Sequence, residues 1–209
     1  MIDLYTWSTP NGRKVSIALE EMGLDYAVHP IDINKDEQFA PHFLAISPNN
    51  KIPGIVDRDT DFSLFESGAI LLYLGEKSGK FAPAEGEGKW RVLEWLMWQM
   101  GGIGPFLGQA HHFLKFNPGK APYAEERYGK EAKRLYGVLD RRLAEVEYMA
   151  GDYSIADMAT FPWIARFGWQ GIDMHEFANV LRWYRALAAR PPVQRGCKVP
   201  DKSYEIPLP

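Results

Sequence analysis

The sequence of 209 residues contains a single cysteine, Cys197, and therefore cannot form an intramolecular disulfide. A framework of structural disulfides and a Cys-x-x-Cys redox pair are both excluded by this count. The chain also lacks an excess of positive charge: its net charge is -3 and its isoelectric point is about 6.0. This balance gives no electrostatic case for nucleic acid or an anionic membrane as a partner.

Long hydrophobic runs are absent as well. No stretch approaches about 18 uninterrupted apolar residues, so we expect no membrane-spanning segment. The N-terminal residues Met-Ile-Asp-Leu-Tyr lack the basic region of a signal peptide, and we therefore expect a cytoplasmic protein. The content of 46% hydrophobic and 24% charged residues is ordinary for a globular chain, and the length fits one large or two small domains.

The first 79 residues alternate between short strands and helices. Apolar runs and turn signals predict strands at 3–7, 26–33, 55–56 and 64–65, and helices at 13–22, 38–45 and 67–78. Pro30 places the second strand at an edge of the sheet, because proline cannot donate to a ladder. This order predicts a small α/β domain with a mixed four-stranded sheet over residues 1–79.

Strand signals stop at the segment 80–88, which is rich in proline and glycine and which we interpret as a linker. Helical spacing then predicts helices at 90–99, 106–116, 123–146, 155–168 and 177–189, with a kink or stop at 101–105. Ser154 and Asp157 form a capping-box pattern, and Asp157 is therefore interpreted as a folding residue. The sequence predicts an all-helical domain over 89–209 that ends in an extended tail.

Two neighbouring features between residues 47 and 74 predict a ligand site. Pro53 precedes the apolar pair Ile55-Val56, so it belongs at the start of a strand or in a turn with a cis peptide bond. Ser67 is predicted to cap the following helix, whose N-terminus favours an anion, and the carboxylate of Glu66 would hold an ammonium. Together they fit an amino-acid head group, although a proline-initiated strand and an ordinary capped helix explain the same residues.

The turn Trp7-Ser8-Thr9-Pro10-Asn11, after the first predicted strand, is a second candidate site. The start of the next helix favours an anion here, and a redox domain would place its reactive cysteines at this turn. Since no cysteine lies within reach, any sulfur would have to arrive on a ligand, where Ser8, Thr9 or Asn11 could bind it. The simpler readings are that Asn11 is a helix cap and Thr9 a turn residue.

Several segments resemble glutathione transferases. Three segments together resemble the signature of that family: Pro48-Asn-Asn-Lys-Ile-Pro53, Leu64-Phe-Glu-Ser-Gly-Ala-Ile70 and Ser154-Ile-Ala-Asp157. Four further segments resemble the bacterial Nu class of the family: 9–12, 98–105, 108–113 and 122–128. Residues 1–79 resemble the thioredoxin-like domain of the family and residues 89–195 its all-helical domain. The tail 196–209 matches no pattern of the family, so the resemblance implies nothing for it.

The resemblance implies that glutathione is a co-substrate bound by the first domain. Glu66 would bind the γ-glutamyl ammonium and Ser67 the adjacent carboxylate. Further contacts would come from the backbone of Ile52 before Pro53, from Lys51 and Gln38 at the glycyl end, and from Arg127, which would reach a neighbouring glutathione from the helical domain.

The resemblance also assigns the catalytic donors to the sulfur, which are Thr9 and Asn11. Lowering a thiol pKa by roughly two units requires about 2.7 kcal/mol, and each hydrogen bond to a charged group supplies ~1.5–3 kcal/mol, so no general base is needed. Ser8 and Tyr5 stay open as alternatives, because other classes of the family use a serine in this turn or a tyrosine near the end of the first strand.

No metal site is predicted. His111 and His112 are adjacent and would point apart on a helix, and no cluster of carboxylates or cysteines accompanies them. The resemblance implies instead a pocket for a second substrate, lined by Phe106, His111, His112 and Trp163.

The activity implied by the resemblance is glutathione-dependent reduction of small disulfides by a homodimer, with weak peroxidase activity toward organic hydroperoxides. Its partners would be glutathione or glutathione disulfide and a small disulfide or electrophile, with no nucleic acid and no membrane. Two alternatives stay open: conjugation of glutathione to electrophiles, and a non-catalytic glutathione-binding regulatory protein on the same fold.

Overall fold

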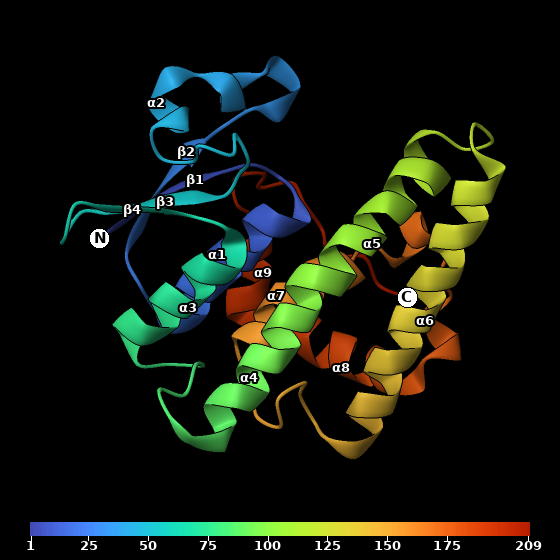
Figure 1. Ribbon diagram of the computed structural model, residues 1–209. Coiled ribbons are helices and arrows are strands. Elements are labelled where there is room, and N and C mark those ends of the chain that lie inside the picture. The colour runs from blue at the N-terminus through green and yellow to red at the C-terminus, as the bar shows by residue number, and fades with distance from the viewer. The chain divides into compact units, whose positions relative to one another are not determined.

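The computed structural model describes residues 1–209, which divide into two compact units (Figure 1). Unit 1 comprises Met1–Ala84 with Arg190–Ile206, and unit 2 comprises Glu85–Ala189 with Pro207–Pro209. A four-stranded mixed sheet lies in unit 1, whereas unit 2 is built from helices. This arrangement confirms the predicted fold class, an α/β domain combined with an all-helical one.

The sheet of unit 1 has the strand order β2-β1-β3-β4. Its strands are β1 (Ile2–Thr6), β2 (Tyr26–Pro30), β3 (Gly54–Asp57) and β4 (Phe62–Phe65). β1 pairs in parallel with β2 and antiparallel with β3, and β3 forms an antiparallel hairpin with β4. β2 is thus an edge strand, which confirms the position expected from Pro30.

Helices cover both faces of this sheet. α1 (Pro10–Met22) and α3 (Ser67–Ser78) pack against each other and lie on one side of it, while α2 (Pro41–Leu44) lies on the other (Figure 1). Two 3-10 turns, η1 (Ile33–Lys35) and η2 (Glu37–Phe39), precede α2. The N-termini of α1 and α3 carry the two segments that the sequence indicates as ligand sites.

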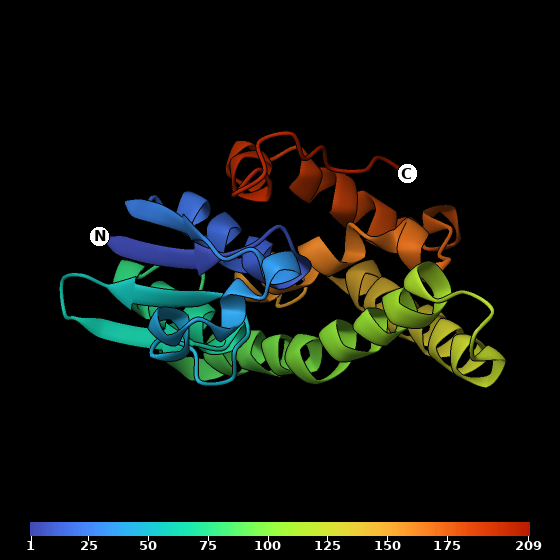
Figure 2. The same ribbon diagram turned by 90° about the horizontal axis from the view of Figure 1, so that it is seen from above.

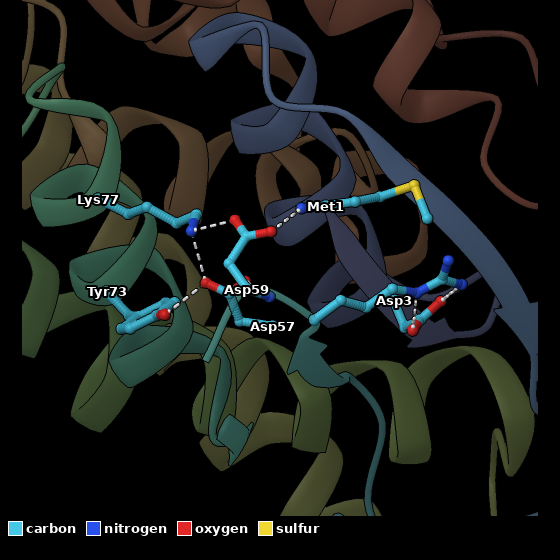
Figure 3. A network of polar contacts seen from close by, with 7 residues as sticks. Met1, Asp3, Asp57, Asp59, Tyr73 and Lys77 are labelled. Carbon is cyan, nitrogen blue, oxygen red and sulfur yellow. Dashed lines mark hydrogen bonds and ion pairs between the residues drawn. The ribbon is translucent and has the colours of Figure 1, made fainter. Parts of the chain in front are cut away.

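α3 is tied to the sheet at its C-terminal end by Lys77 (Figure 3). The ammonium of Lys77 lies 2.7 Å from Asp57 Oδ2 and 2.8 Å from Asp59 Oδ2, and the hydroxyl of Tyr73 donates to Asp57 Oδ2 at 2.6 Å. Burial alone would raise the pKa of Asp57, but the hydrogen bonds from Lys77 and Tyr73 lower it to about 2. Asp57 therefore stays ionised, and the ion pairs fix the direction of α3.

The C-terminal segment departs from the prediction. Residues 190–206 belong to unit 1 and not to a helical domain over 89–209, and Pro191 begins a further helix, α9 (Pro191–Cys197), where an extended tail was expected. Proline is tolerated there because the first helical positions need no N–H donor. α9 packs against α1, and a Cβ at Gly196 would lie 2.6 Å from Ile17 Cα, so only glycine allows this approach.

Unit 2 begins with α4 (Gly86–Trp98), inside the segment predicted as a linker. The chain does not stop at 101–105: a π-helical turn, η3 (Gln99–Ile103), connects α4 with α5 (Gly104–Ala110), and the green helical run bends as it continues (Figure 2). Pro105 is tolerated because it stands in the first turn of α5. Proline has no N–H to donate, and the first turn of a helix is where that loss is best accommodated.

The remaining elements of unit 2 are helical too: a second π-helical turn η4 (His111–Phe116), α6 (Pro122–Glu145), α7 (Ile155–Ile164), η5 (Phe167–Gln170), η6 (Met174–Glu176) and α8 (Ala178–Ala188). α6 packs against α5 and α8. A bilayer-spanning helix is not found among the helices of either unit.

α7 is buried along its whole length and begins with the predicted capping box, which is confirmed. The carboxylate of Asp157 is fully buried and accepts hydrogen bonds from the N–H of Ser154 at 3.0 Å, the N–H of Met149 at 3.0 Å and Nε1 of Trp183 at 2.8 Å. Burial raises the pKa of Asp157 to about 6, although the hydrogen bonds from these donors act to lower it. One carboxylate thus joins α7, α8 and the loop between α6 and α7.

Candidate functional site

The turn between β1 and α1 places Thr9 at the N-cap of α1. Its Oγ1 accepts a hydrogen bond from the N–H of Gly12 at 3.2 Å, and Pro10 and Asn11 are the first two helical residues. The cap role left open for Asn11 therefore belongs to Thr9. A hydroxyl that accepts one hydrogen bond keeps its own proton for donation, so Thr9 can cap the helix and still donate to a ligand.

This turn is packed tightly against the end of β1. The N–H of Thr9 donates to the carbonyl of Trp7 at 2.7 Å, and a Cβ at Gly12 would lie 2.3 Å from Trp7 O. Any side chain at residue 12 would displace the turn, so the start of α1 has a single position relative to the sheet.

Ser8 is bound from within the protein. Its Oγ accepts a hydrogen bond from Nη2 of Arg13 at 2.8 Å, and Nε of the same guanidinium donates to the carbonyl of Cys197 at 2.9 Å. Arg13 is 2% exposed. Sequence reasoning missed it, because the contact with Cys197 spans 184 positions and no local pattern indicates it.

Tyr5 lies within β1, where side chains alternate between the two faces of the sheet. Its ring stacks on His29 with centroids 4.7 Å apart and contacts Phe43 of α2 at 6.3 Å, on the face opposite to Leu4 and Thr6. Burial raises the pKa of Tyr5. The side chain thus belongs to the α2 side of the sheet, and its proton is held more firmly than that of an ordinary tyrosine.

The segment before β3 has the predicted backbone. The peptide bond between Ile52 and Pro53 is cis, and β3 begins at the next residue, which confirms the proline at the start of a strand. The hydroxyl of Ser47 donates to the carbonyl of Lys51 at 2.8 Å and so fixes the approach to this bond. The side chain of Lys51 is exposed and that of Ile52 is half-buried.

Glu66, and not Ser67, occupies the N-cap of α3, which corrects the prediction. The carbonyl of Glu66 accepts the first helical hydrogen bond, from the N–H of Ile70 at 2.9 Å, and Ser67 is the first helical residue. Glu66 has φ 69° and ψ 112°, a conformation that residues other than glycine rarely adopt. Such backbone strain costs about 1–3 kcal/mol and is concentrated at functional sites, and here it presents an exposed carboxylate.

A buried lysine lies behind Ser67. Lys14 of α1 is 1% exposed, and its ammonium lies 3.2 Å from Ser67 Oγ. Burial lowers the pKa of Lys14 to about 7, while the negative charge of Glu66 opposes the shift. Sequence reasoning missed Lys14, although its spacing of three and four residues from Ile17 and Ala18 places it on the buried stripe of α1.

Gln38 lies on η2 of unit 1. Its Oε1 is buried and has no hydrogen-bond partner, while Nε2 is 3.5 Å from Asp36 Oδ1. Because a buried polar atom without a partner is uncommon in native proteins, this side chain has hydrogen-bonding capacity left for a ligand.

Arg127 lies in unit 2, on the exposed side of α6. It lines a hollow of about 560 Å³ together with residues of α5 and α6: Phe106, Tyr123, Glu126, Tyr128, Lys130, Glu131 and Arg134. Of the four residues expected in a second-substrate pocket, Phe106 contributes to this hollow, whereas His111, His112 and Trp163 do not.

His111 and Trp163 are instead part of the interior of unit 2, with 6% and 8% exposure, and their rings stack with centroids 5.6 Å apart. Nε2 of His111 lies 2.9 Å from Nε2 of Gln170, which makes His111 the acceptor of that hydrogen bond. His112 is exposed, so the two histidines do point apart as expected. No group of three or more His, Cys, Asp or Glu side chains that could hold a metal occurs in the structure.

The burial of His111 makes the stability of the fold sensitive to acid. Burial, with the nearby charge of Arg166, lowers the pKa of His111 to about 4, whereas a histidine in the unfolded chain has a pKa of about 6.5. Between these values the unfolded chain binds a proton that the folded protein does not, so stability falls as the pH falls through this window. We expect the free energy of unfolding to lose about 2 kcal/mol from this group between pH 7.5 and pH 5.

Urea unfolding of the wild type and of His111→Gln at both pH values measures this loss. The difference in stability between the two proteins should shrink at pH 5, because glutamine does not titrate. A difference that is the same at both pH values would contradict the expectation.

Residues 1–76 match the family model described as "Glutathione S-transferase, N-terminal domain", and residues 103–191 match "Glutathione S-transferase, C-terminal domain". The chain belongs to the glutathione S-transferase family. Among curated relatives of this family member, the disulfide-bond oxidoreductase YfcG of Escherichia coli is 49% identical over 197 residues, with 91% of this chain and 92% of YfcG covered. The disulfide-bond oxidoreductase YghU of the same organism is 40% identical over 212 residues, with 93% of this chain and 73% of YghU covered.

Solved structures of glutathione transferases superpose closely on this family member. One from Burkholderia graminis, with two glutathione molecules bound per subunit, is 43% identical with a TM-score of 0.88, covering 97% of this chain and 89% of that one. One from Pseudomonas putida, with one glutathione disulfide bound per subunit, is 43% identical with a TM-score of 0.89, covering 95% and 91%. The resemblance inferred from the motifs is thus confirmed over nearly the whole chain.

Proposed function

We propose that this chain uses glutathione to reduce small disulfides. The observation that carries the proposal is the first turn of α1, where the Thr9 hydroxyl stands at a helix N-terminus and the protein provides no thiol of its own in this turn. Such a turn favours a bound thiolate over the neutral thiol. The identity of 49% to a disulfide-bond oxidoreductase supports the same conclusion.

In this proposal the γ-glutamyl head of glutathione binds at the start of α3. The exposed carboxylate of Glu66 receives the ammonium, and the hydroxyl and N–H of Ser67 receive the carboxylate. The Lys14 ammonium donates to Ser67 Oγ at 3.2 Å, which places a positive charge behind the group that would receive the carboxylate. Ile52, two residues before β3, would pair its backbone with the peptide of glutathione in the manner of an added strand.

The remaining contacts concern the two ends of glutathione and its neighbour. Lys51 and Gln38 would bind the glycyl end, where the unpartnered Oε1 of Gln38 would accept a hydrogen bond from the glycyl N–H. Arg127 would reach a neighbouring glutathione from the helical unit, and the hollow that it lines would admit the second substrate beside Phe106.

Thr9 and Asn11 would donate to the sulfur. Thr9 is favoured over Tyr5, because Tyr5 is engaged by His29 and Phe43 on the α2 face of the sheet. Ser8 stays an alternative donor, because its hydroxyl accepts a hydrogen bond from Arg13 and, like that of Thr9, keeps its own proton. The two donors and the start of α1 together supply the roughly 2.7 kcal/mol that a thiol pKa lower by about two units requires.

The reaction follows from thiolate attack on a disulfide. The thiolate of one glutathione attacks a sulfur of the substrate, which forms a mixed disulfide and releases the other substrate sulfur as a thiolate that takes up a proton. A second glutathione thiolate then attacks the glutathione sulfur of the mixed disulfide, which yields glutathione disulfide and the second substrate thiol. The bound ligands of the two neighbours, paired glutathione and glutathione disulfide, correspond to the reactants and the product of this cycle.

We further propose weak peroxidase activity toward organic hydroperoxides, since the same thiolate can attack a peroxide oxygen. A homodimer is supported by Trp90 and Met97, which lie seven positions apart on α4 and are 66% and 50% exposed. We place the enzyme in the cytoplasm, where glutathione is kept reduced.

Two measurements on the purified protein test the proposed function. Isothermal titration calorimetry with glutathione and with glutathione disulfide should give binding heat for both. Turnover with hydroxyethyl disulfide should exceed turnover with a chlorinated dinitrobenzene. Binding without turnover of either substrate would favour a regulatory protein, and faster turnover of the electrophile would favour conjugation. The absence of any binding would refute the proposal.

Replacing Thr9 by valine removes the hydroxyl at nearly constant volume. We expect kcat for disulfide reduction to fall about 30-fold, which corresponds to the loss of about 2 kcal/mol from one hydrogen bond to a thiolate. The Kd for glutathione should change by less than about threefold, since the amino-acid head is bound elsewhere. Asn11→Ala should show the same pattern.

Thr9→Ser is the matched control, because it keeps both the cap and the donor. The melting temperature must be recorded with the kinetics, since loss of the cap costs about 1 kcal/mol of helix stability. If valine weakened binding as much as it lowered kcat, Thr9 would be a binding residue without a catalytic part.

A further inference from the structure

The C-terminal segment 190–206 is attached to α1 along the length of that helix. Arg190 forms a two-pronged ion pair with Glu21 at 2.7 and 2.8 Å, and Nε of Arg195 lies 2.6 Å from Glu20 Oε2. The hydroxyl of Ser16 donates to the carbonyl of Gly196 at 2.7 Å. These contacts carry α9 toward the N-terminal end of α1, where the sulfur-binding turn begins.

Beyond α9 the chain folds back onto Arg13. Asp201 organises a turn by accepting hydrogen bonds from the N–H and the hydroxyl of Ser203 at 3.0 and 2.6 Å, and the N–H of Tyr204 donates to Asp201 O at 3.2 Å. The turn places the ring of Tyr204 over the guanidinium of Arg13, whose Cζ lies 3.5 Å from the ring centroid. A cation in this position is attracted by the negative face of the ring.

Arg13 thus connects three separate parts of unit 1. Its Nη2 holds the hydroxyl of Ser8, its Nε holds the carbonyl of Cys197, and its flat face lies under Tyr204. A buried guanidinium with all these partners has one orientation, so the position of Ser8, directly before Thr9, depends on contacts that the tail provides.

We propose that Arg13 is a positioning residue for the sulfur-binding turn and that the tail, through Tyr204, holds it in place. The inference rests on the proposed function, because it assigns Arg13 a part in activating the glutathione thiol. Arg13 orients Ser8 and therefore the backbone that leads into Thr9. The tail 198–206 is then part of the catalytic apparatus, although it matches no motif of the family.

Of the charged groups around Arg13, Asp201 opposes its positive charge, and the others form pairs of opposite sign. Asp201 of the tail is the acidic group that interacts with Arg13, and its pKa is lowered first by the hydrogen bonds from Ser203 and also by the guanidinium. Lys14 is the next residue of α1, and Glu66 at the start of α3 interacts with Lys14. The acidic residues Glu20 and Glu21 of α1 are paired with Arg195 and Arg190.

The test compares the full-length wild type with Tyr204→Ala and Tyr204→Phe. The pKa of enzyme-bound glutathione is followed by the ultraviolet absorbance of its thiolate as the pH is raised, and kcat and KM for glutathione are measured with hydroxyethyl disulfide. We expect Tyr204→Ala to raise the bound thiol pKa by about half a unit and to lower kcat about fivefold, as loss of one partly desolvated cation–π contact predicts. The KM for glutathione should change by less than about twofold.

Tyr204→Phe keeps the ring and should restore the wild-type pKa and kcat. Leu208→Ala changes an exposed residue just beyond this tail, 79% accessible, and controls for a general effect of altering the C-terminal end. Arg13→Gln should raise the thiol pKa further than Tyr204→Ala does. If Arg13→Gln does not fold, the comparison of Tyr204→Ala with Tyr204→Phe still tests the proposal. Tyr204 is only half-buried, so both of these variants are expected to fold.

The outcomes separate this inference from the proposed function. A Tyr204→Ala protein that is less stable but keeps the wild-type thiol pKa and kcat would mean that Arg13 and Tyr204 only attach the tail, and the inference would be overturned while the proposed function stands. A wild-type protein that binds no glutathione would overturn both.

Discussion

Glu66→Gln is expected to weaken glutathione binding about 10- to 100-fold, because the amide cannot form the charge-assisted hydrogen bonds, worth ~1.5–3 kcal/mol, that a carboxylate makes with an ammonium. The turnover number at saturating glutathione should change by less than about threefold, since Glu66 contacts the end of the molecule remote from the sulfur. Calorimetric titration gives the Kd, and steady-state kinetics with hydroxyethyl disulfide give kcat.

Glu76→Gln is the matched control. Glu76 is an exposed glutamate on the same helix, α3, and a charge change there should leave the Kd unaltered. Glutamine has the same side-chain length as glutamate. Glu66→Gln therefore changes the charge at the residue with the unusual backbone without changing its size. Equal binding by the wild type and Glu66→Gln would mean that the strained carboxylate has another purpose.

Asp157→Ala is expected to lower the free energy of unfolding by about 3–5 kcal/mol. The substitution leaves three buried donors, the N–H groups of Met149 and Ser154 and Nε1 of Trp183, without their shared acceptor. It also removes half of the capping box of α7, the helix at the centre of unit 2. Equilibrium unfolding in urea, followed by tryptophan fluorescence and by circular dichroism, measures the loss.

Asp152→Ala tests whether any aspartate in this region would give the same result. Asp152 is exposed, and its replacement should change stability by no more than about 0.5 kcal/mol. A loss below about 1 kcal/mol for Asp157→Ala would show that water enters and satisfies the orphaned donors.

The features that were predictable from the sequence are those with a local physical cause. Pro30 marked an edge strand, Pro53 marked the start of β3, and Ser154 with Asp157 marked the start of α7, because each effect acts within a few residues. The family signature around Glu66 and Ser67 added the ligand. The cap position at α3 was wrong by one residue, since no sequence rule anticipates a glutamate with positive φ.

What could not be predicted depends on contacts between distant segments. α8 ends three residues before Pro191 and α9 begins at it, and the packing of Gly196 against Ile17, 179 positions away, accompanies this second helix. Lys14 and Arg13 belong to a helix whose apolar stripe was recognised, but their partners Ser67 and Cys197 lie 53 and 184 positions away. Burial of a charged side chain against such partners is decided by tertiary structure alone.

The position of the sole thiol has a consequence for chemical resistance. Cys197 is 2% exposed, and the turn that would receive the reactive sulfur has no cysteine to alkylate or to oxidise beyond repair. A sulfur damaged by peroxide or by an electrophile would leave with its tripeptide and be replaced by the next molecule from solution. A catalyst of this kind would outlast the oxidative bursts that permanently disable enzymes with a nucleophilic cysteine of their own.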